Sequence, residues 1–174
     1  MNMILRPFLA TDLESILDVL TDTTVKQTYM LPDFGKREDA TPLFERLMTL
    51  STDSKHYVRC IAAGEAAMGF INDVKIKDGK IELGYALAPR YHGQGYMTQA
   101  LQAAMAELFQ LGYREVVCGA FSENAASMRV MEKCGMKRIA FTEDIEYRGK
   151  THLCIYYTKE NDYAEIPLSG SGSR

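Results

Sequence analysis

The segment that decides the fold is Leu87-Ala-Pro-Arg-Tyr-His-Gly-Gln-Gly-Tyr-Met-Thr98. A strand ends just before Pro89, two glycines follow one residue apart, and an amphipathic helix begins directly after them. The apolar residues of this helix recur every three or four positions: Met97, Leu101, Ala104, Leu108 and Leu111. Glycine lets the backbone approach a ligand closely, and the first amides of a helix have no partner within it. The segment therefore predicts a strand-turn-helix unit able to bind phosphate at the helix N-terminus.

The glycines alone leave other interpretations open. A tight turn between a strand and a helix would need the same two residues, and so would a general nucleotide-binding α/β protein. The two common nucleotide loops do not match, because the segment lacks a Gly-Lys-Ser/Thr ending and a third glycine followed by a distant acidic residue.

Working outward, apolar periodicity and turn residues predict a mixed α/β sheet. Helices are expected at 12–21, 41–50, 97–111 and 124–133, and strands at 3–6, 57–62, 67–76, 80–87, 114–121, 136–141 and 152–158. Thr11 and Glu14 form a capping-box pattern before the first helix. Asp78-Gly79 is typical of a two-residue hairpin turn between antiparallel strands. The alternation of strand and helix after residue 80 requires crossover connections and some parallel pairing.

Composition excludes several classes of protein. The 174 residues carry a formal net charge of −3, which argues against a surface for nucleic acid or anionic membranes. The four cysteines are widely spread with no metal-ligand spacing, so we expect free thiols in a reducing, cytoplasmic compartment and no metal site. We expect one domain over 1–165, followed by a disordered Gly/Ser-rich tail over 166–174.

Three ordered blocks of sequence resemble one known family. They are Ile81-Glu-Leu-Gly-Tyr-Ala-Leu87, Tyr91-His-Gly-Gln-Gly-Tyr-Met-Thr-Gln-Ala-Leu101 and Glu123-Asn-Ala-Ala-Ser-Met-Arg-Val-Met-Glu-Lys-Cys-Gly-Met136. Together they resemble the GNAT N-acetyltransferases, most of all the branch that acetylates ribosomal-protein N-termini. The resemblance implies an α/β (α+β) GNAT fold, with a mixed, mostly antiparallel central sheet, helices on both faces and splayed central strands that hold the cofactor. It also implies acetyl-CoA-dependent transfer of an acetyl group to a primary amine.

The resemblance assigns cofactor contacts to the glycine segment and its neighbours. They are Tyr85, Ala86, Leu87, His92, Gly93, Gln94, Gly95, Tyr96, Met97, Thr98 and Asn124. In the family, a loop of the form Gln/Arg-x-x-Gly-x-Gly/Ala holds the pyrophosphate, and here it maps onto 92–97. His92 and Met97 depart from that pattern, whereas a register that begins at Arg90 restores it.

The catalytic residues are less clearly marked. Glu82, on the strand beside the cofactor arm, is the candidate base, and Ser127 is the candidate proton donor, although a surface carboxylate and a helix-start hydroxyl would explain them equally well. A neighbouring branch of the family uses an acid-base pair at positions that are Gly119 and Met131 here. The missing tyrosine at Met131 motivates an alternative, a non-catalytic protein that senses acyl-CoA.

The amine acceptor is expected to contact 25–36 and 143–150, both loop-like in composition. The acidic residues of these two segments, together with Glu38, favour a cationic acceptor such as a peptide N-terminus, a polyamine or an aminoglycoside-like amine. They are Asp33, Glu143, Asp144 and Glu146. A homodimer is implied by the resemblance.

Overall fold

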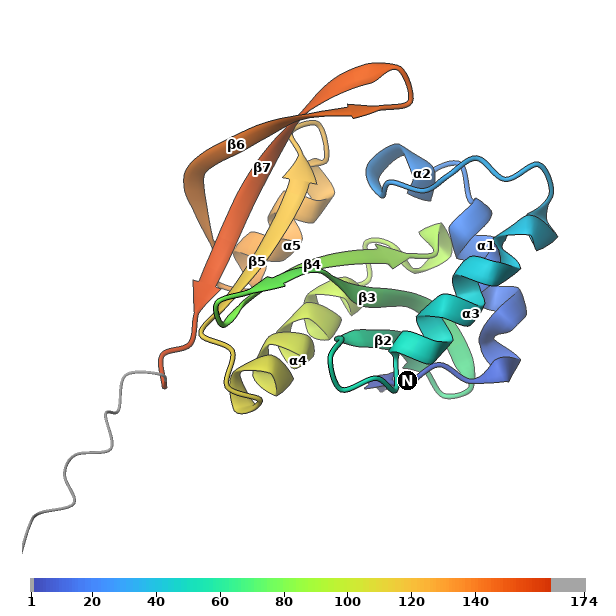
Figure 1. Cartoon of the computed structure of the whole chain (residues 1–174), viewed down its shortest axis with the longest axis horizontal. Coiled ribbons are helices and arrows are strands. Elements are labelled where there is room, and N and C mark those ends of the chain that lie inside the picture. Colours follow the sequence, from blue (N-terminus) through green and yellow to red (C-terminus); the bar gives the residue numbers. More distant parts are fainter. Residues whose placement is uncertain (1, 164–174) are drawn as a thin grey trace, which may run out of the picture.

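The computed structural model describes residues 2–163, which form one seven-stranded sheet with helices packed on it (Figure 1). The strands are β1 (Met3–Arg6), β2 (Val58–Ala63), β3 (Ala66–Lys77), β4 (Lys80–Leu87), β5 (Glu115–Phe121), β6 (Lys137–Tyr147) and β7 (Lys150–Glu160). Their order is β1-β2-β3-β4-β5-β7-β6, and only β4 and β5 run parallel. The tail expected at 166–174 lies outside the described residues, and the single domain over 1–165 stays a prediction.

Helices cover both faces of the sheet, as expected. They are α1 (Leu13–Thr21), α2 (Val25–Thr28), α3 (Thr41–Leu50), α4 (Tyr96–Gln110) and α5 (Ala125–Lys133), with short 3-10 turns at Ala10–Asp12, Arg37–Ala40 and Pro89–Tyr91. The core under α1 and α3 includes Ile16 and Phe70, and a separate core under α4 includes Ile81 and Leu101. Within residues 2–163 no helix has the length and apolar character needed to span a membrane.

The parallel pair β4–β5 separates part-way along its length. The two strands pair from Lys80 opposite Glu115 to Leu83 opposite Cys118, and no further. Beyond that point β4 stays bonded to β3, and β5 stays bonded to β7. The expected splay of the central strands is therefore present, and it opens a gap in the middle of the sheet.

Backbone geometry confirms the expected hairpin and explains one close contact. Asp78 and Gly79 both have positive φ, +53° and +73°, as a two-residue hairpin turn requires. On β3, an added Cβ at Gly69 would lie 2.1 Å from the carbonyl oxygen of Ala86. Only glycine lets β3 approach the end of β4 this closely.

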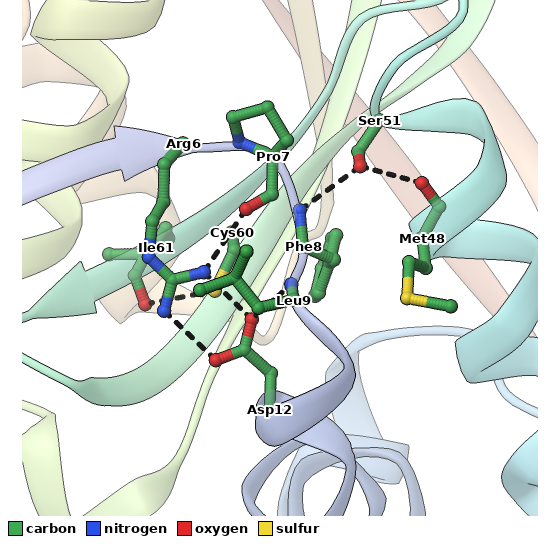
Figure 2. Close-up of polar contacts among 9 residues, drawn as sticks. All are labelled: Arg6, Pro7, Phe8, Leu9, Asp12, Met48, Ser51, Cys60 and Ile61. Atoms are coloured by element: carbon green, nitrogen blue, oxygen red, sulfur yellow. Dashed lines mark hydrogen bonds and ion pairs between the residues drawn. The ribbon is translucent and has the colours of Figure 1, made fainter.

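The capping box predicted at Thr11 and Glu14 is wrong. Asp12 accepts a hydrogen bond from the Leu9 amide (2.8 Å) and a bidentate pair from the Arg6 guanidinium (2.7 and 2.9 Å), as Figure 2 shows. Charge-assisted bonds of this kind are stronger than a neutral hydroxyl cap. Burial alone raises the pKa of Asp12, but the Arg6 and Leu9 hydrogen bonds outweigh it and hold that pKa below its usual value.

The expectation of a loop over 143–150 is confirmed at the turn of Arg148 and Gly149 and wrong for the rest of that range. Those residues form the outer part of the β6–β7 hairpin, with a turn at Arg148 (φ +53°) and Gly149 (φ +71°). The composition misled because most β6 side chains are exposed, so the strand lacks the alternation of apolar and polar residues that marks a half-buried strand.

Candidate active site

A cavity of about 320 Å³ lies where β4 and β5 diverge. Its walls come from the end of β4, the glycine segment, β5, α5 and α2. Of the residues singled out from the sequence, those that line it are Tyr85, Ala86, Leu87, His92, Gly93, Gly95, Tyr96, Met97, Thr98, Asn124 and Ser127. Two that do not line it are Gln94 and Glu82. The structure thus brings the end of β4 and the glycine segment together with the start of α5.

The glycine segment forms an open cradle at the start of α4. Gly95 has φ +82° and is the N-cap of the helix, while Gly93 has φ +70°. An added Cβ at Gly93 would meet no atom within 4 Å, so it would occupy the space left for a ligand. Gly93 and Gly95 both have positive φ and both line the cavity. They are the two glycines of the loop pattern when it begins at Arg90, so the backbone favours that register over the one that begins at His92.

Two side chains of this segment hydrogen-bond to the backbone next to the loop and so stabilise it. The His92 Nε2 lies 2.8 Å from the carbonyl oxygen of Leu87, which ties the loop to the end of β4. The Gln94 amide donates to the carbonyl oxygen of Arg90 at 2.8 Å. Whatever Gln94 contributes to a ligand therefore comes from its backbone.

Helix α5 supplies the opposite wall. The Asn124 Oδ1 accepts a hydrogen bond from the Ser127 amide (3.1 Å) and so caps the helix. Arg129 and Lys133, four residues apart on α5, also line the cavity. Sequence reasoning missed this basic pair, although its spacing on a predicted helix was the available signal. It places two positive charges on the wall of the cavity.

A pair of hydroxyls lies inside the cavity. The Tyr85 hydroxyl of β4 is 2.6 Å from the Ser127 Oγ of α5, across the gap between the two walls. Burial is the main cause of a strongly raised pKa for Tyr85, so its proton stays bound at neutral pH. One hydroxyl donates to the other, so the pair can present one remaining O–H donor to a developing negative charge.

Glu82 lies away from this cavity, in a neighbouring hollow of about 250 Å³ that Lys75, Lys77, Lys80 and Val117 also line. It precedes Gly84, a cavity residue, by two positions, roughly 7 Å along a strand. Burial, and then the nearby Glu143, raise the pKa of Glu82, while Lys75 lowers it. Glu82 is thus a partly buried carboxyl with raised proton affinity, one strand repeat from the cavity.

Comparison with known proteins explains this arrangement. The family model described as "Acetyltransferase (GNAT) domain" matches residues 2–137, more than three quarters of the chain. The chain belongs to the GNAT acetyltransferase family.

Two curated proteins of Bacillus subtilis (strain 168) are similar to it. The uncharacterized N-acetyltransferase YnaD is 31% identical over 77 residues, 44% of this chain and 45% of that protein. The probable N-acetyltransferase YjcK is 28% identical over 108 residues, 60% and 59% of the two chains. The matched parts span about half the length of these relatives.

Solved structures of the GNAT family share the fold over nearly the whole chain. RimL, a ribosomal L7/L12 alpha-N-protein acetyltransferase in complex with coenzyme A, has a TM-score of 0.83 at 20% identity and covers 95% of this chain and 97% of its own. The spermidine N-acetyltransferase of Vibrio cholerae, in complex with CoA and spermine, has a TM-score of 0.77 at 15% identity, covering 91% and 95%. At these identities the likeness establishes the fold alone.

Gly119 and Met131 stand at the two positions that hold an acid-base pair in a neighbouring branch of the family, and the structure shows how each residue is packed. Met131 is fully buried in the core under α4, so this position packs instead of facing the cavity. At Gly119 an added Cβ would lie 2.8 Å from the Tyr156 ring and 3.1 Å from the Cys154 Sγ. A carboxylate at 119 has no room, and any acid or base must come from elsewhere in the GNAT scaffold.

The far end of the cavity reaches the segment expected to bind the acceptor. Val25, Thr28 and Tyr29 line it, and the Tyr29 hydroxyl donates to the Asn72 Oδ1 at 2.7 Å. Burial raises the pKa of Tyr29 to about 12. The cavity therefore runs from the start of α4 to α2, past the Tyr85–Ser127 pair.

Proposed function

We propose that this protein is an acetyl-CoA-dependent N-acetyltransferase that acts on a primary amine by direct attack. The observation that carries the proposal is the cavity between β4 and β5, which ends on a glycine cradle at the N-terminus of α4. Its shape and donors fit acetyl-CoA: open space at Gly93, unpaired helix-start amides and the basic pair Arg129 and Lys133.

Each wall has a part in holding this cosubstrate. Backbone amides of 93–98 would bind the pyrophosphate, and Arg129 and Lys133 would balance its charge. The end of β4, residues 85–87, would pair with the pantetheine arm, and Asn124 would contact the same arm. Acetyl-CoA supplies the activated thioester, and the proposal needs no metal.

The reaction forms a nitrogen–carbon bond and breaks the carbon–sulfur bond of the thioester. An alkyl ammonium has a pKa near 10, so its proton must be removed before attack. Glu82 is the proposed base and would take that proton through water, since it lies in the neighbouring hollow. Ser127, held by Tyr85 at 2.6 Å, would donate a hydrogen bond to the departing thiolate. The second proton of the attacking nitrogen passes to solvent as the amide forms, and the thiolate takes a proton from solvent.

The acceptor is proposed to be a peptide or protein N-terminus or a small-molecule amine. RimL is named for a ribosomal protein and the Vibrio cholerae enzyme for spermidine, so both kinds of amine occur among proteins of this fold. The carboxylate of Glu82, two residues before the cavity residue Gly84, and the nearby carboxylate of Glu143 favour a cationic molecule. Cytoplasmic location and a homodimer remain part of the proposal, and light scattering after gel filtration checks the dimer.

The test combines binding with turnover. Calorimetry with acetyl-CoA should show one site per chain, and Gly95→Glu should abolish binding because a carboxylate would enter the cradle. Thiol release should then be followed with peptide N-termini, polyamines and aminoglycosides as acceptors. Binding with no turnover of any amine would indicate the sensing protein instead, and no binding at all would contradict both.

A further inference from the structure

One tyrosine joins two segments that are far apart in the sequence. Tyr147, at the tip of the β6–β7 hairpin, donates from its hydroxyl to the carbonyl oxygen of Lys26 (2.7 Å) and accepts from the Leu31 amide (3.2 Å). The carbonyl oxygen of Tyr29 lies 3.3 Å away. In Figure 1 the hairpin tip reaches over toward the α2 segment, across the upper side of the sheet. One hydroxyl thus holds the backbone of the chain on either side of Tyr29.

The same side chain is anchored on its other side. Its ring packs against Phe121, at the end of β5 (6.1 Å between centroids), and against His152 of β7 (6.2 Å). Next to it, Arg148 forms an ion pair with Asp33, which also lies 3.6 Å from the Lys26 ammonium. The contact therefore combines a part-buried hydroxyl and the buried Lys26 with an exposed ion pair between Arg148 and Asp33.

These contacts join the hairpin tip to the α2 segment, which lines one end of the cavity. We call the joined residues the acceptor collar: residues 25–31, Phe121 and the hairpin tip 147–148. Val25, Thr28 and Tyr29 of the collar line the cavity, while Tyr147 holds the same segment from outside. Without the Tyr147 hydroxyl, the α2 segment would lose its hydrogen bonds to the hairpin.

We propose that Tyr147 determines acceptor specificity by fixing the position of the α2 segment, so that Val25, Thr28 and Tyr29 limit the width of the acceptor that the cavity admits. This rests on the proposed acetyl transfer and adds a limit on the width of the acceptor. Butylamine, an extended polyamine or an unfolded peptide end would pass, whereas an amine next to a bulky group would be excluded. Tyr147 does not line the cavity, so it acts by positioning α2.

The experiment uses Tyr147→Phe, which keeps the ring and removes the hydroxyl. The matched control is Tyr157→Phe, on the same hairpin, whose hydroxyl bonds to Glu132 (2.9 Å) on α5. Two acceptors with the same CH₂–NH₂ group, butylamine and adamantylmethylamine, measure width. We expect wild type and Tyr157→Phe to prefer butylamine in kcat/KM, and Tyr147→Phe to lose about tenfold of that preference. The acetyl-CoA Kd should stay the same in all three.

Hydrogen–deuterium exchange of 25–31 gives a readout that needs no activity. Exchange should be faster in Tyr147→Phe and unchanged in Tyr157→Phe. Arg148→Ala removes the exposed ion pair with Asp33 and the cation–π contact with the Tyr147 ring. It serves if Tyr147→Phe does not fold, and it should shift exchange and preference in the same direction. Unchanged preference or unchanged exchange in a folded collar variant overturns the inference. Wild type that binds acetyl-CoA but acetylates neither amine nor any peptide overturns the proposed function, and the acceptor limit with it.

Discussion

Gly93 and Gly112 have similar backbone conformations, so variants at the two sites distinguish an effect on ligand binding from an effect on stability. Gly93 (φ +70°) and Gly112 (φ +96°) both occupy the left-handed region, and neither has an atom within 4 Å of an added Cβ. Alanine at either site should cost about 1 kcal/mol of stability. Only Gly93 lines the cavity, so only Gly93→Ala should weaken acetyl-CoA binding as well. Calorimetry and thermal unfolding of both variants test this, and equal loss of binding in the two would remove the cradle's role.

If Glu82 is the base, two substitutions near it should shift the pH dependence of kcat/KM in opposite directions. Burial is the main cause of the raised pKa of Glu82. Glu143 raises this pKa further, and Lys75 lowers it. A base acts when deprotonated, so kcat/KM should rise with pH through the raised pKa of Glu82. Glu143→Gln removes a like charge and should move this rise to lower pH, whereas Lys75→Met should move it to higher pH.

Lys77→Met is the matched control for this pair of variants. Lys77 lines the same hollow, but unlike Lys75 it has no resolved effect on the pKa of Glu82. The pH profile should be measured with one acceptor throughout, so that the acceptor's own ionisation is common to all. Profiles that coincide for all three variants would exclude Glu82 as the base.

At the scale of elements, the ion pair between β1 and the turn before α1 fixes the N-terminal layer. The Asp12 side chain is 1% exposed and that of Arg6 17%, and Asp12 also holds the Leu9 amide (Figure 2). Asp12→Asn leaves the guanidinium without its charged partner and should lower the free energy of unfolding by roughly 3 kcal/mol at neutral pH.

The pH dependence of this effect has a definite sign. The folded-state pKa of Asp12 lies below its ordinary value of 3.8, so the ion pair stabilises the protein above that pH. The stability is lost as pH falls through the lowered pKa. Urea unfolding at pH 7 and below pH 4 should therefore show a difference between wild type and Asp12→Asn that shrinks with acid. A constant difference would contradict the assignment.

At the scale of the whole molecule, the sheet consists of two parts with a narrow junction. β1–β4 and β5–β7 are joined within the sheet by four residue pairs, Lys80–Leu83 with Glu115–Cys118. A ligand in the gap touches both parts. Acetyl-CoA at a hundred times its Kd should add about 2.7 kcal/mol of stability and raise the melting temperature by several degrees. Exchange should slow at the end of β4 and at the start of α5 together, and protection of one part alone would argue against binding in the gap.

Much of the fold followed from local sequence. The hairpin at Asp78-Gly79 and the helix start at Gly95 were predictable because the turn conformation depends on the residues that adopt it. The capping of α1 was not, because Thr11 competes with Asp12, and the choice depends on Arg6 in a neighbouring strand. The outer part of β6, 142–147, was missed because most of its side chains are exposed and show little apolar alternation.

The amino-acid sequence by itself determined the glycine cradle, the strand before it and the helix after it, since these depend on residues adjacent in the chain. It also determined the GNAT family, through the spacing of three such blocks. Only the tertiary structure decided that Tyr85 meets Ser127 across 42 positions, that Glu82 lies in a separate hollow, and that Tyr147 clasps the chain at Lys26, 121 positions away. These contacts depend on strand register and on packing between distant elements, which no local pattern encodes.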